Sequence, residues 1–359
     1  PLVGTPAYRA GLVAGDVIVE IDGKSAANIT IEEAVQRLKG RPGTPVTVTV
    51  VHAGSDARQT VKITREIVHI DTVLGDRRKA DDHWDFMLDA AKGIGYIRVV
   101  AFSRETANEL RRALEELKRQ ELRGLVLDLR FNPGGLLSAA IEVSNLFISQ
   151  GRIVSTAGRN SPERTWDAQK QGAFEGFPMA ILVNHYSASA SEIVSACLQD
   201  HKRAVIVGER TWGKGSVQNV ITLDERAPAG GADGAGGDSV AHPALKLTIA
   251  GYRRPSGKNI DRMPGAKEDD AWGVTPDPGF EVKLSDEERA TLMVDRSRRD
   301  LVLPKKPAAE APQAKTAKTE PAKAEPPMPP DQPAPSPPPV DRQLQKAIQY
   351  LSTELARAK

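Results

Sequence analysis

Residues 186–218, YSASASEIVSACLQDHKRAVIVGERTWGKGSVQ, set the architecture of this chain. The stretch begins with serines at positions 187, 189 and 191, which alternate with alanines, and it ends just beyond Lys214, which lies between two glycines. A segment with helical character and the β-branched run RAVIV separate the two ends. The strand-like run PMAILVN precedes the serines. Both polar turns therefore follow apolar strands, which is where the sites of open α/β sheets gather.

The middle of the chain, residues 67–285, repeats this alternation of strands and helices. GYIRVVAF and GLVLDLR have the composition of buried strands, and residues 103–120 and 136–150, which follow them, have the pattern of helices. ALKLTIAGYRR, from residue 244, predicts a late strand. The alternation predicts a layered α/β domain whose strands are covered on both faces.

The serine turn offers a hydroxyl at the start of a helix. Free backbone N–H groups and the helix dipole favour developing negative charge there, and the alanines leave space for a substrate carbonyl. Ser189 is the middle serine of SASASE. The ordinary alternative is that these serines are helix N-caps, which is a common role of serine at such positions.

The lysine turn supplies a candidate base. A serine hydroxyl is a weak nucleophile unless a neighbouring group takes its proton, and Lys214 can do so only when it is neutral, a state that an apolar setting favours. The residues expected to provide that setting are Val205, Ile206, Val207 and Trp212. Because histidine is the usual base, His185 and His201 stay as alternatives. The chain has no Gly-x-Ser-x-Gly and no His-Glu-x-x-His motif, so a zinc peptidase is not indicated.

A third element, DLRFNPGG at residues 128–135, places two glycines after an apolar strand. A Gly-Gly turn at this point frees backbone N–H groups to face a ligand, as an oxyanion hole requires. The alternative is a plain strand-to-helix turn, for which glycine is the default residue.

Together, the three elements resemble the tail-specific, C-terminal processing serine peptidases. The matching stretches are VLDLRFNPGGLL, the run from ILVN to GSVQ, ALKLTIAGYRRPSGKNI and GVTPDPGFEV. The resemblance implies a crotonase-like layered α/β peptidase core with a Ser/Lys dyad in place of a triad. It implies that Ser189 is the nucleophile and that Lys214, 25 residues later, is its base.

The same resemblance implies the supporting residues. Gln218 matches the glutamine that orients the lysine. The backbone amides of Ala190 and Gly135 match the oxyanion donors, and Gly134 is the less favoured glycine. A His-Tyr pair precedes the first serine, where many members have two small residues. We expect this difference to alter the floor of the pocket and to leave the dyad untouched.

The first 66 residues have the pattern of a strand, a helix and two further strands. Thr30 and Glu33 have the spacing of a capping box at the start of the helix. GTPAYRAGLVAGDVIVEIDGK resembles the signature of PDZ domains, which bind the end of a peptide as an added strand. In bacterial modules of this type, the loop and the strand that hold the peptide lie before the position of Pro1. We therefore expect an incomplete, N-terminally truncated module that does not bind peptides as the full module does.

We expect four parts: a PDZ-like domain over residues 1–66, a peptidase core over 67–303, a linker over 304–340 and an amphipathic helix over 341–359. The linker consists mainly of Pro, Ala, Lys and Glu, so it is predicted to be disordered, as is the Gly- and Ala-rich insert from Ala227. The apolar face of the helix is formed by Leu344, Ile348, Leu351 and Leu355. Docking of this helix on its own core is favoured over binding to a partner or to a second copy.

The function implied by the resemblance is a serine endopeptidase that cleaves proteins near their C-termini through an acyl-enzyme, without a cofactor or a metal. Its partners would be protein or peptide substrates with exposed C-termini, in the periplasm or another extracytoplasmic space. The net charge of +2 gives no sign of nucleic acid as a partner. A homo-oligomer stays open, as does membrane association through a segment upstream of Pro1. The alternative function is a catalytically silent PDZ-containing binding or scaffold protein on the same fold, which would be expected to lack Ser189 or Lys214.

Overall fold

The computed structural model describes residues 1–52, 56–159, 161–170, 174–222, 244–301 and 340–357. The insert from Ala227 and, apart from Val340, the linker over 304–340 lie outside the described residues. The chain divides into two compact units, one of residues 1–70 with 288–340 and one of residues 71–287 with 341–359. Within the described residues, no helix is both long enough and apolar enough to cross a membrane.

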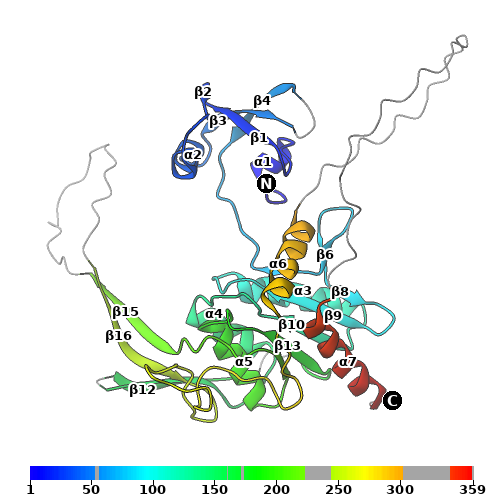
Figure 1. Cartoon of the computed structure of the whole chain (residues 1–359), viewed down its shortest axis with the longest axis vertical. Coiled ribbons are helices and arrows are strands. Elements are labelled where there is room, and N and C mark those ends of the chain that lie inside the picture. The colour runs from blue at the N-terminus through cyan, green and yellow to red at the C-terminus, as the bar shows by residue number, and fades with distance from the viewer. Residues whose placement is uncertain (53–55, 160, 171–173, 223–243, 302–339, 358–359) are drawn as a thin grey trace, which may run out of the picture. The chain divides into compact units, whose positions relative to one another are not determined.

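The first unit is built on a four-stranded antiparallel sheet with the order β2-β1-β3-β4 (Figure 1). Its elements are α1 (Pro6–Arg9), β1 (Val17–Ile21), β2 (Lys24–Ser25), α2 (Ile31–Leu38), β3 (Pro45–Val51), β4 (Arg58–Thr64) and most of α6 (Asp286–Asp300). The predicted capping box is confirmed: Glu33 N donates to Thr30 Oγ1 and Thr30 N donates to Glu33 Oε2, both at 3.2 Å. Ile21 and Val48 lie in the small core of this unit.

The second unit contains a central sheet with the order β14-β13-β10-β9-β5, and β8 also pairs with β9. The strands are β5 (Val73–Leu74), β8 (Met87–Asp89), β9 (Ile94–Val99), β10 (Gly124–Asp128), β13 (Met179–Val183) and β14 (Val205–Gly208). The four strands β9, β10, β13 and β14 are parallel. Their carboxyl ends therefore meet at one edge, and the loops that follow them lie together.

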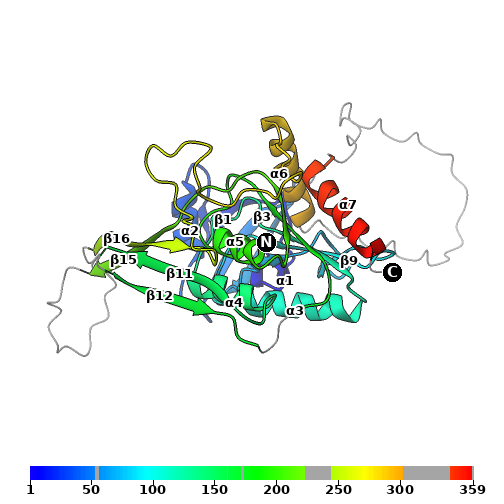
Figure 2. The ribbon, with the colours of Figure 1, turned by 90° about the horizontal axis from the view of Figure 1, so that it is seen from below.

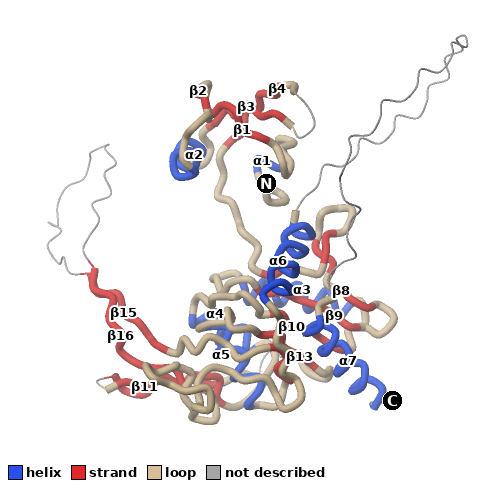
Figure 3. Tube along the Cα trace, in the orientation of Figure 1, coloured by secondary structure: helices blue, strands red, loops and turns tan. Residues whose placement is uncertain are grey.

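Helices cover both faces of this sheet. They are α3 (Thr106–Arg119), α4 (Leu137–Asn145), α5 (Ala190–Asp200) and α7 (Arg342–Arg357). Because side chains alternate along a strand, Leu125 and Leu127 of β10 enter the core with α3, α4 and α5, whereas Val126 packs in a second core with Ala347 and Leu351 of α7. Figure 3 shows β13 between α5 and α7. The α/β prediction is confirmed, and the C-terminal helix docks on its own core.

A second sheet, with the order β12-β11-β16-β15, extends from the lysine turn. Its strands are β11 (Arg152–Gly158), β12 (Ser161–Asp167), β15 (Ser216–Thr222) and β16 (Ala244–Arg253), and a short hairpin of β6 (Arg77–Arg78) and β7 (Trp84–Asp85) stands elsewhere in the unit. Figure 2 shows this sheet at one end of the second unit and α7 at the other. β15 begins two residues after Lys214, so the sheet fixes the chain beyond that residue.

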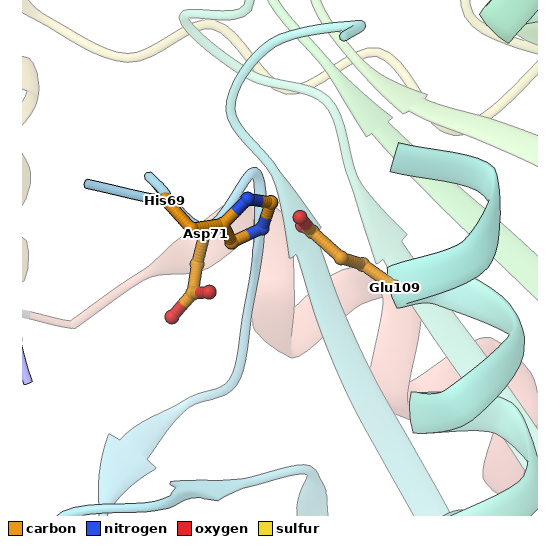
Figure 4. Close-up of side chains that lie close together, drawn as sticks. All are labelled: His69, Asp71 and Glu109. Atoms are coloured by element: carbon orange, nitrogen blue, oxygen red, sulfur yellow. The ribbon is translucent and has the colours of Figure 1, made fainter. Parts of the chain in front are cut away.

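Glu109 anchors the chain where the second unit begins. Its Oε2 accepts hydrogen bonds from Thr72 N at 2.7 Å, Thr72 Oγ1 at 2.9 Å and Val73 N at 3.0 Å. Figure 4 shows the Glu109 side chain reaching from α3 towards the segment that carries Asp71. The buried carboxylate is thus used to hold the start of β5 against α3.

Candidate active site

Ser189 occupies the N-cap position of α5, at the end of the turn that follows β13. Its backbone has φ 56° and ψ −113°, a conformation rare for a residue with a side chain. Such strain persists only where the surrounding structure fixes the backbone, and it concentrates at functional sites. The side chain is half buried, so the hydroxyl is reachable from solvent.

The two flanking serines differ from Ser189 in their surroundings. Both are fully buried. Ser187 Oγ donates to Leu129 O at 2.8 Å, and Ser191 Oγ donates to Asn132 O at 3.0 Å. Within the described residues, the Ser189 hydroxyl donates to no backbone carbonyl. Two of the three alternating serines therefore fasten the turn, and the middle one presents its hydroxyl.

The Gly-Gly turn touches the serine turn directly. Asn132 O accepts a hydrogen bond from Ala188 N at 3.0 Å. Gly134 has φ 99°, and a Cβ placed on it would lie 2.7 Å from Ser189 Cβ and from Ala188 O, so only glycine fits. Gly134 N donates to Asn132 Oδ1 at 2.8 Å, so this amide is already hydrogen-bonded within the turn.

The amides of Gly135 and Ala190 have no such partner in the part of the chain that the structure describes. Ala190 is the first residue of α5, where a helix leaves N–H groups unpaired. Gly135 is exposed, and a Cβ on it would lie 2.1 Å from Phe102 O. These two free donors stand on the two turns that meet at Ser189, whereas the Gly134 amide is occupied.

Glu192 joins the serine turn to the lysine turn. Its Oε2 accepts Ser189 N and Lys214 N, both at 2.8 Å, and its Oε1 accepts Thr211 Oγ1 at 2.5 Å and Gly213 N at 2.6 Å. Burial raises the pKa of this carboxyl, and the hydrogen bonds from Thr211 and the three amides offset part of that effect. One buried side chain thus fixes the backbones of Ser189 and Lys214 relative to each other.

The glycines that flank Lys214 allow its turn to pack closely on the chain at residues 261–262. Gly213 has φ 83°, and a Cβ on it would lie 2.7 Å from Arg262 Cβ. A Cβ on Gly215 would lie 2.3 Å from Asp261 N, and Gly215 N donates to Asp261 Oδ1 at 2.9 Å. The backbone of the lysine turn is therefore held on both sides of Lys214.

The Lys214 side chain is exposed, so the expectation that its neighbours bury it is wrong for this structure. Ile206 and Val207 are fully buried, but they point into the two cores of the sheet. Trp212 is itself 55% exposed. The buried apolar side chains of β14, the strand before the lysine turn, pack in the cores of the sheet. They therefore do not cover the ammonium group of Lys214.

Two side-chain contacts that a working Ser/Lys dyad would need are not formed. Among the described residues, no hydrogen bond joins Lys214 Nζ to Ser189 Oγ, and none joins the Gln218 side chain to Lys214. Gln218 lies exposed in β15, where it pairs with Thr248 of β16. The structure therefore brings together Ser189, Ala190 and the glycine turn, and it holds the lysine turn beside them with its side chain in solvent.

Neither histidine alternative contacts Ser189. His201 is the C-cap of α5, at the opposite end of an 11-residue helix, and its Nε2 is 2.7 Å from Arg152 O. His185 Nδ1 is 3.1 Å from Glu209 Oε2. Both rings have other partners, whereas the turn that carries Lys214 is joined to the serine turn through Glu192.

Two residues of the site were not predicted from the sequence. Glu192 stands three residues after Ser189, which is the spacing of a capping box, and that signal was available in SASASE. Asn132 organises the glycine turn through its side chain and its carbonyl, and it was missed because its partners Val99 and Ser191 are distant in sequence and only Gly134 is close.

Residues 93–278 match the model of peptidase family S41, and residues 2–52 match the model of the PDZ domain. The carboxy-terminal-processing protease of Bartonella bacilliformis is 38% identical over 289 residues, which cover 79% of this chain and 58% of that protein. The carboxyl-terminal-processing protease of Synechocystis sp. is 34% identical over 284 residues, with the same two coverages of 79% and 58%. The chain spans a little over half the length of these relatives.

Among solved structures, the photosystem II D1 C-terminal processing protease matches with a TM-score of 0.45 and 31% sequence identity. The match covers 79% of this chain and 67% of that one.

Proposed function

We propose that this chain, which belongs to peptidase family S41, is a serine-type endopeptidase that cleaves proteins near their C-termini. In this proposal Ser189 is the nucleophile and Lys214 is its base. The proposal rests on one observation above all: of three alternating serines, only Ser189 is partly exposed, and it has a strained backbone where two turns that carry free amides meet.

The proposed reaction is acyl transfer. Neutral Lys214 takes the proton of the Ser189 hydroxyl, whose oxygen attacks the carbonyl carbon of the scissile peptide bond. The amides of Ala190 and Gly135 donate to the resulting oxyanion. Lys214 then gives the proton to the leaving amine, and the C–N bond breaks to leave an acyl-enzyme. A water molecule, deprotonated by Lys214, releases the acyl group and regenerates Ser189.

Because the ammonium group of Lys214 is exposed, the bound substrate has a part in making this lysine a base. A lysine acts as a base only when it has lost its proton, and removal from water favours the neutral form. Because the fold leaves Lys214 in solvent, we propose that the bound polypeptide covers it and brings Gln218 into contact with it. Catalytic hydrogen bonds are often formed only in the complex with substrate.

The finer parts of the function belong to the same proposal. The substrates are protein or peptide chains with exposed C-termini, and the reaction uses no cofactor. We place the enzyme in the periplasm or another extracytoplasmic space, by its resemblance to the C-terminal processing peptidases.

The proposal is tested by the cleavage of an unfolded protein with a free C-terminus, followed by mass spectrometry of the products. The same substrate with an amidated C-terminus tests whether the end group is recognised. Cleavage near the C-terminus that disappears in Ser189→Ala supports the proposal. Cleavage that survives in Ser189→Ala would contradict it.

A further inference from the structure

Arg130 lies immediately before the oxyanion turn, and its guanidinium is fully buried. Nε and Nη2 both donate to Asp128, the last residue of β10, with Nη2 2.6 Å from Oδ2. Tyr96 donates its hydroxyl to the same carboxylate at 2.7 Å. A buried charge is tolerated only where its partners satisfy it, so each of these contacts matters to the position of the guanidinium.

The other side of the guanidinium is held from the C-terminal helix, 211 residues later in the chain. Nη1 donates to Asp341 Oδ1 at 2.9 Å and Nη2 donates to Asp341 Oδ2 at 2.8 Å, a two-pronged pair. Nη1 also donates to Gln343 Oε1 at 3.0 Å. Burial acts to raise the pKa of Asp341, but the Arg130 charge and its hydrogen bonds outweigh burial, so this pKa lies below its ordinary value.

Asp341 is itself fixed by the helix that it begins. Its Oδ1 accepts Leu344 N at 3.0 Å, which caps the first turn of α7. Gln343 Nε2 donates to Val282 O at 2.7 Å. Ala347 and Leu351 are fully buried in the core that includes Val126 of β10. The helix therefore seats Asp341 on the same strand that leads into the oxyanion turn.

The residues after Arg130 form a continuous path to the oxyanion donors. Phe131 has φ 64°, a left-handed conformation that its surroundings must enforce, and its N–H donates to Asn184 Oδ1 at 3.0 Å. Asn132 then holds Gly134 through its side chain. The Arg130 guanidinium is fixed on one side by β10 and on the other by α7. The residue that precedes this strained turn is therefore held rigidly.

We propose that Asp341 is a positioning residue for catalysis: by clamping Arg130, the docked C-terminal helix holds the 131–135 turn in the shape that forms the oxyanion hole. This inference rests on the proposed function. Oxyanion donors act on the transition state more than on the bound substrate. Loss of the clamp therefore lowers kcat and leaves KM nearly unchanged.

The test compares Asp341→Asn with Glu354→Gln in the full chain. Each change removes one carboxylate charge, Asp341 from the residue before α7 and Glu354 from α7 itself, but Glu354 pairs with Arg357 on the surface, at 2.8 Å. Asp341→Asn is expected to lose about 10- to 100-fold in kcat, because a displacement of catalytic groups by about 1 Å can cost on the order of 10²-fold in rate. Glu354→Gln is expected to keep the kcat and the KM of the wild type.

Chemical rescue separates positioning from a general loss of structure. The Asp341 side chain is 14% exposed, so a small carboxylate can reach the space left by Asp341→Ala. Formate should restore part of the kcat of this variant, and chloride at equal ionic strength should not. An undiminished kcat in Asp341→Asn, a change confined to KM, or a loss that formate does not restore would overturn the proposal.

Amide hydrogen exchange measures how rigidly the 131–135 turn is held, independently of enzyme activity. Exchange in peptides that cover residues 129–136 should be faster in Asp341→Asn than in Glu354→Gln. Equal exchange in the two variants would overturn the inference even if the enzyme is active.

A wild-type chain that cleaves nothing would refute the proposed function, while this measurement would still decide the role of the helix. If Asp341→Asn does not fold, Gln343→Met removes the neutral acceptor of Arg130 together with the hydrogen bond to Val282 O, and the same faster exchange is expected.

Discussion

The serine turn and the lysine turn of this site differ in how fully the fold holds their backbones and side chains in place. Around Ser189, the flanking hydroxyls are bonded, the backbone is strained into one conformation, and two free amides stand on the turns that meet there. Around Lys214, the backbone is held by Glu192 and Asp261, yet the side chain lies in solvent. The comparison teaches that the fold alone positions the proposed nucleophile and oxyanion donors, whereas the proposed base would become effective only when something covers it.

The largest expected effect comes from removing the nucleophile. Ser189→Ala should lower the rate of peptide cleavage about 10⁴-fold or more, because the flanking serines are buried and bonded to carbonyls and cannot replace it. Steady-state cleavage of an unfolded substrate measures this loss, and the thermal unfolding midpoint checks that the fold is intact. A variant that keeps most of its activity would show that the serine side has been assigned to the wrong residue.

Replacing the base should be nearly as damaging. Lys214→Arg is expected to be as inactive as Lys214→Ala, because arginine stays protonated and cannot accept a proton. The wild-type rate should rise with pH as the base loses its proton. Rates of the three proteins between pH 6 and 10 test this, and an active Arg variant would return the search for the base to His185.

Breaking the bridge between the two turns should have an intermediate effect. In Glu192→Gln, the amide NH₂ would face N–H donors that now point at carboxylate oxygens. Displacement of either dyad residue by about 1 Å can cost on the order of 10²-fold in rate. Glu281→Gln, at an exposed carboxylate, is the matched control. Equal kcat in the two variants would show that Glu192 does not couple the turns.

Changes at the flanking serines should affect stability more than rate. Ser187→Ala and Ser191→Ala each remove a buried hydroxyl that donates to a carbonyl. We expect each to lower the free energy of unfolding by about 1–3 kcal/mol and to change kcat little. Urea unfolding and cleavage assays on the same samples measure both quantities. A collapse of kcat in Ser187→Ala with unchanged stability would move the nucleophile to Ser187.

The smallest effect concerns the pH dependence of stability. Because burial raises the folded-state pKa of Glu192, its favourable contribution is fully present below the unfolded-state pKa of about 4.3 and is lost as pH rises through the folded-state value. The stability of the wild type relative to Glu192→Gln should therefore fall with rising pH, by about 1.4 kcal/mol for each unit between the two pKa values. Denaturant unfolding from pH 4 to 7 measures it, and a difference that grows with pH would contradict this assignment.

Much of the fold could be predicted because its signals are local. β10 and β13 are short apolar runs bounded by turns, and the helix α7 shows its buried face in the spacing of its leucines. The strands β11 and β12 were not predicted, because RIVSTAG and SPERTWD have neither an apolar run nor regular alternation. β11 pairs with β16, which is distant in sequence, and β12 joins the sheet only through β11, so tertiary contacts decide their conformation.

The site shows the same limit. The turn motifs and the family resemblance pointed to Ser189, Lys214 and the glycine turn, and the structure shows how the first and the last of these meet. The exposure of Lys214 could not be foreseen, since it depends on which way the side chains of β14 point. Arg130 and Asp341 lie 211 residues apart, and no spacing rule connects them.

The central claim, that Ser189 is a nucleophile activated by Lys214, is tested most directly by covalent labelling. The wild type and the Lys214→Ala and Lys214→Arg variants are treated with a fluorophosphonate, and the modified residue is located by peptide mass spectrometry. The account predicts phosphonylation at Ser189 in the wild type, at a rate that rises with pH, and little or none in either lysine variant. Labelling at Ser187 or Ser191, or labelling of Ser189 at an equal rate in all three proteins, would contradict it.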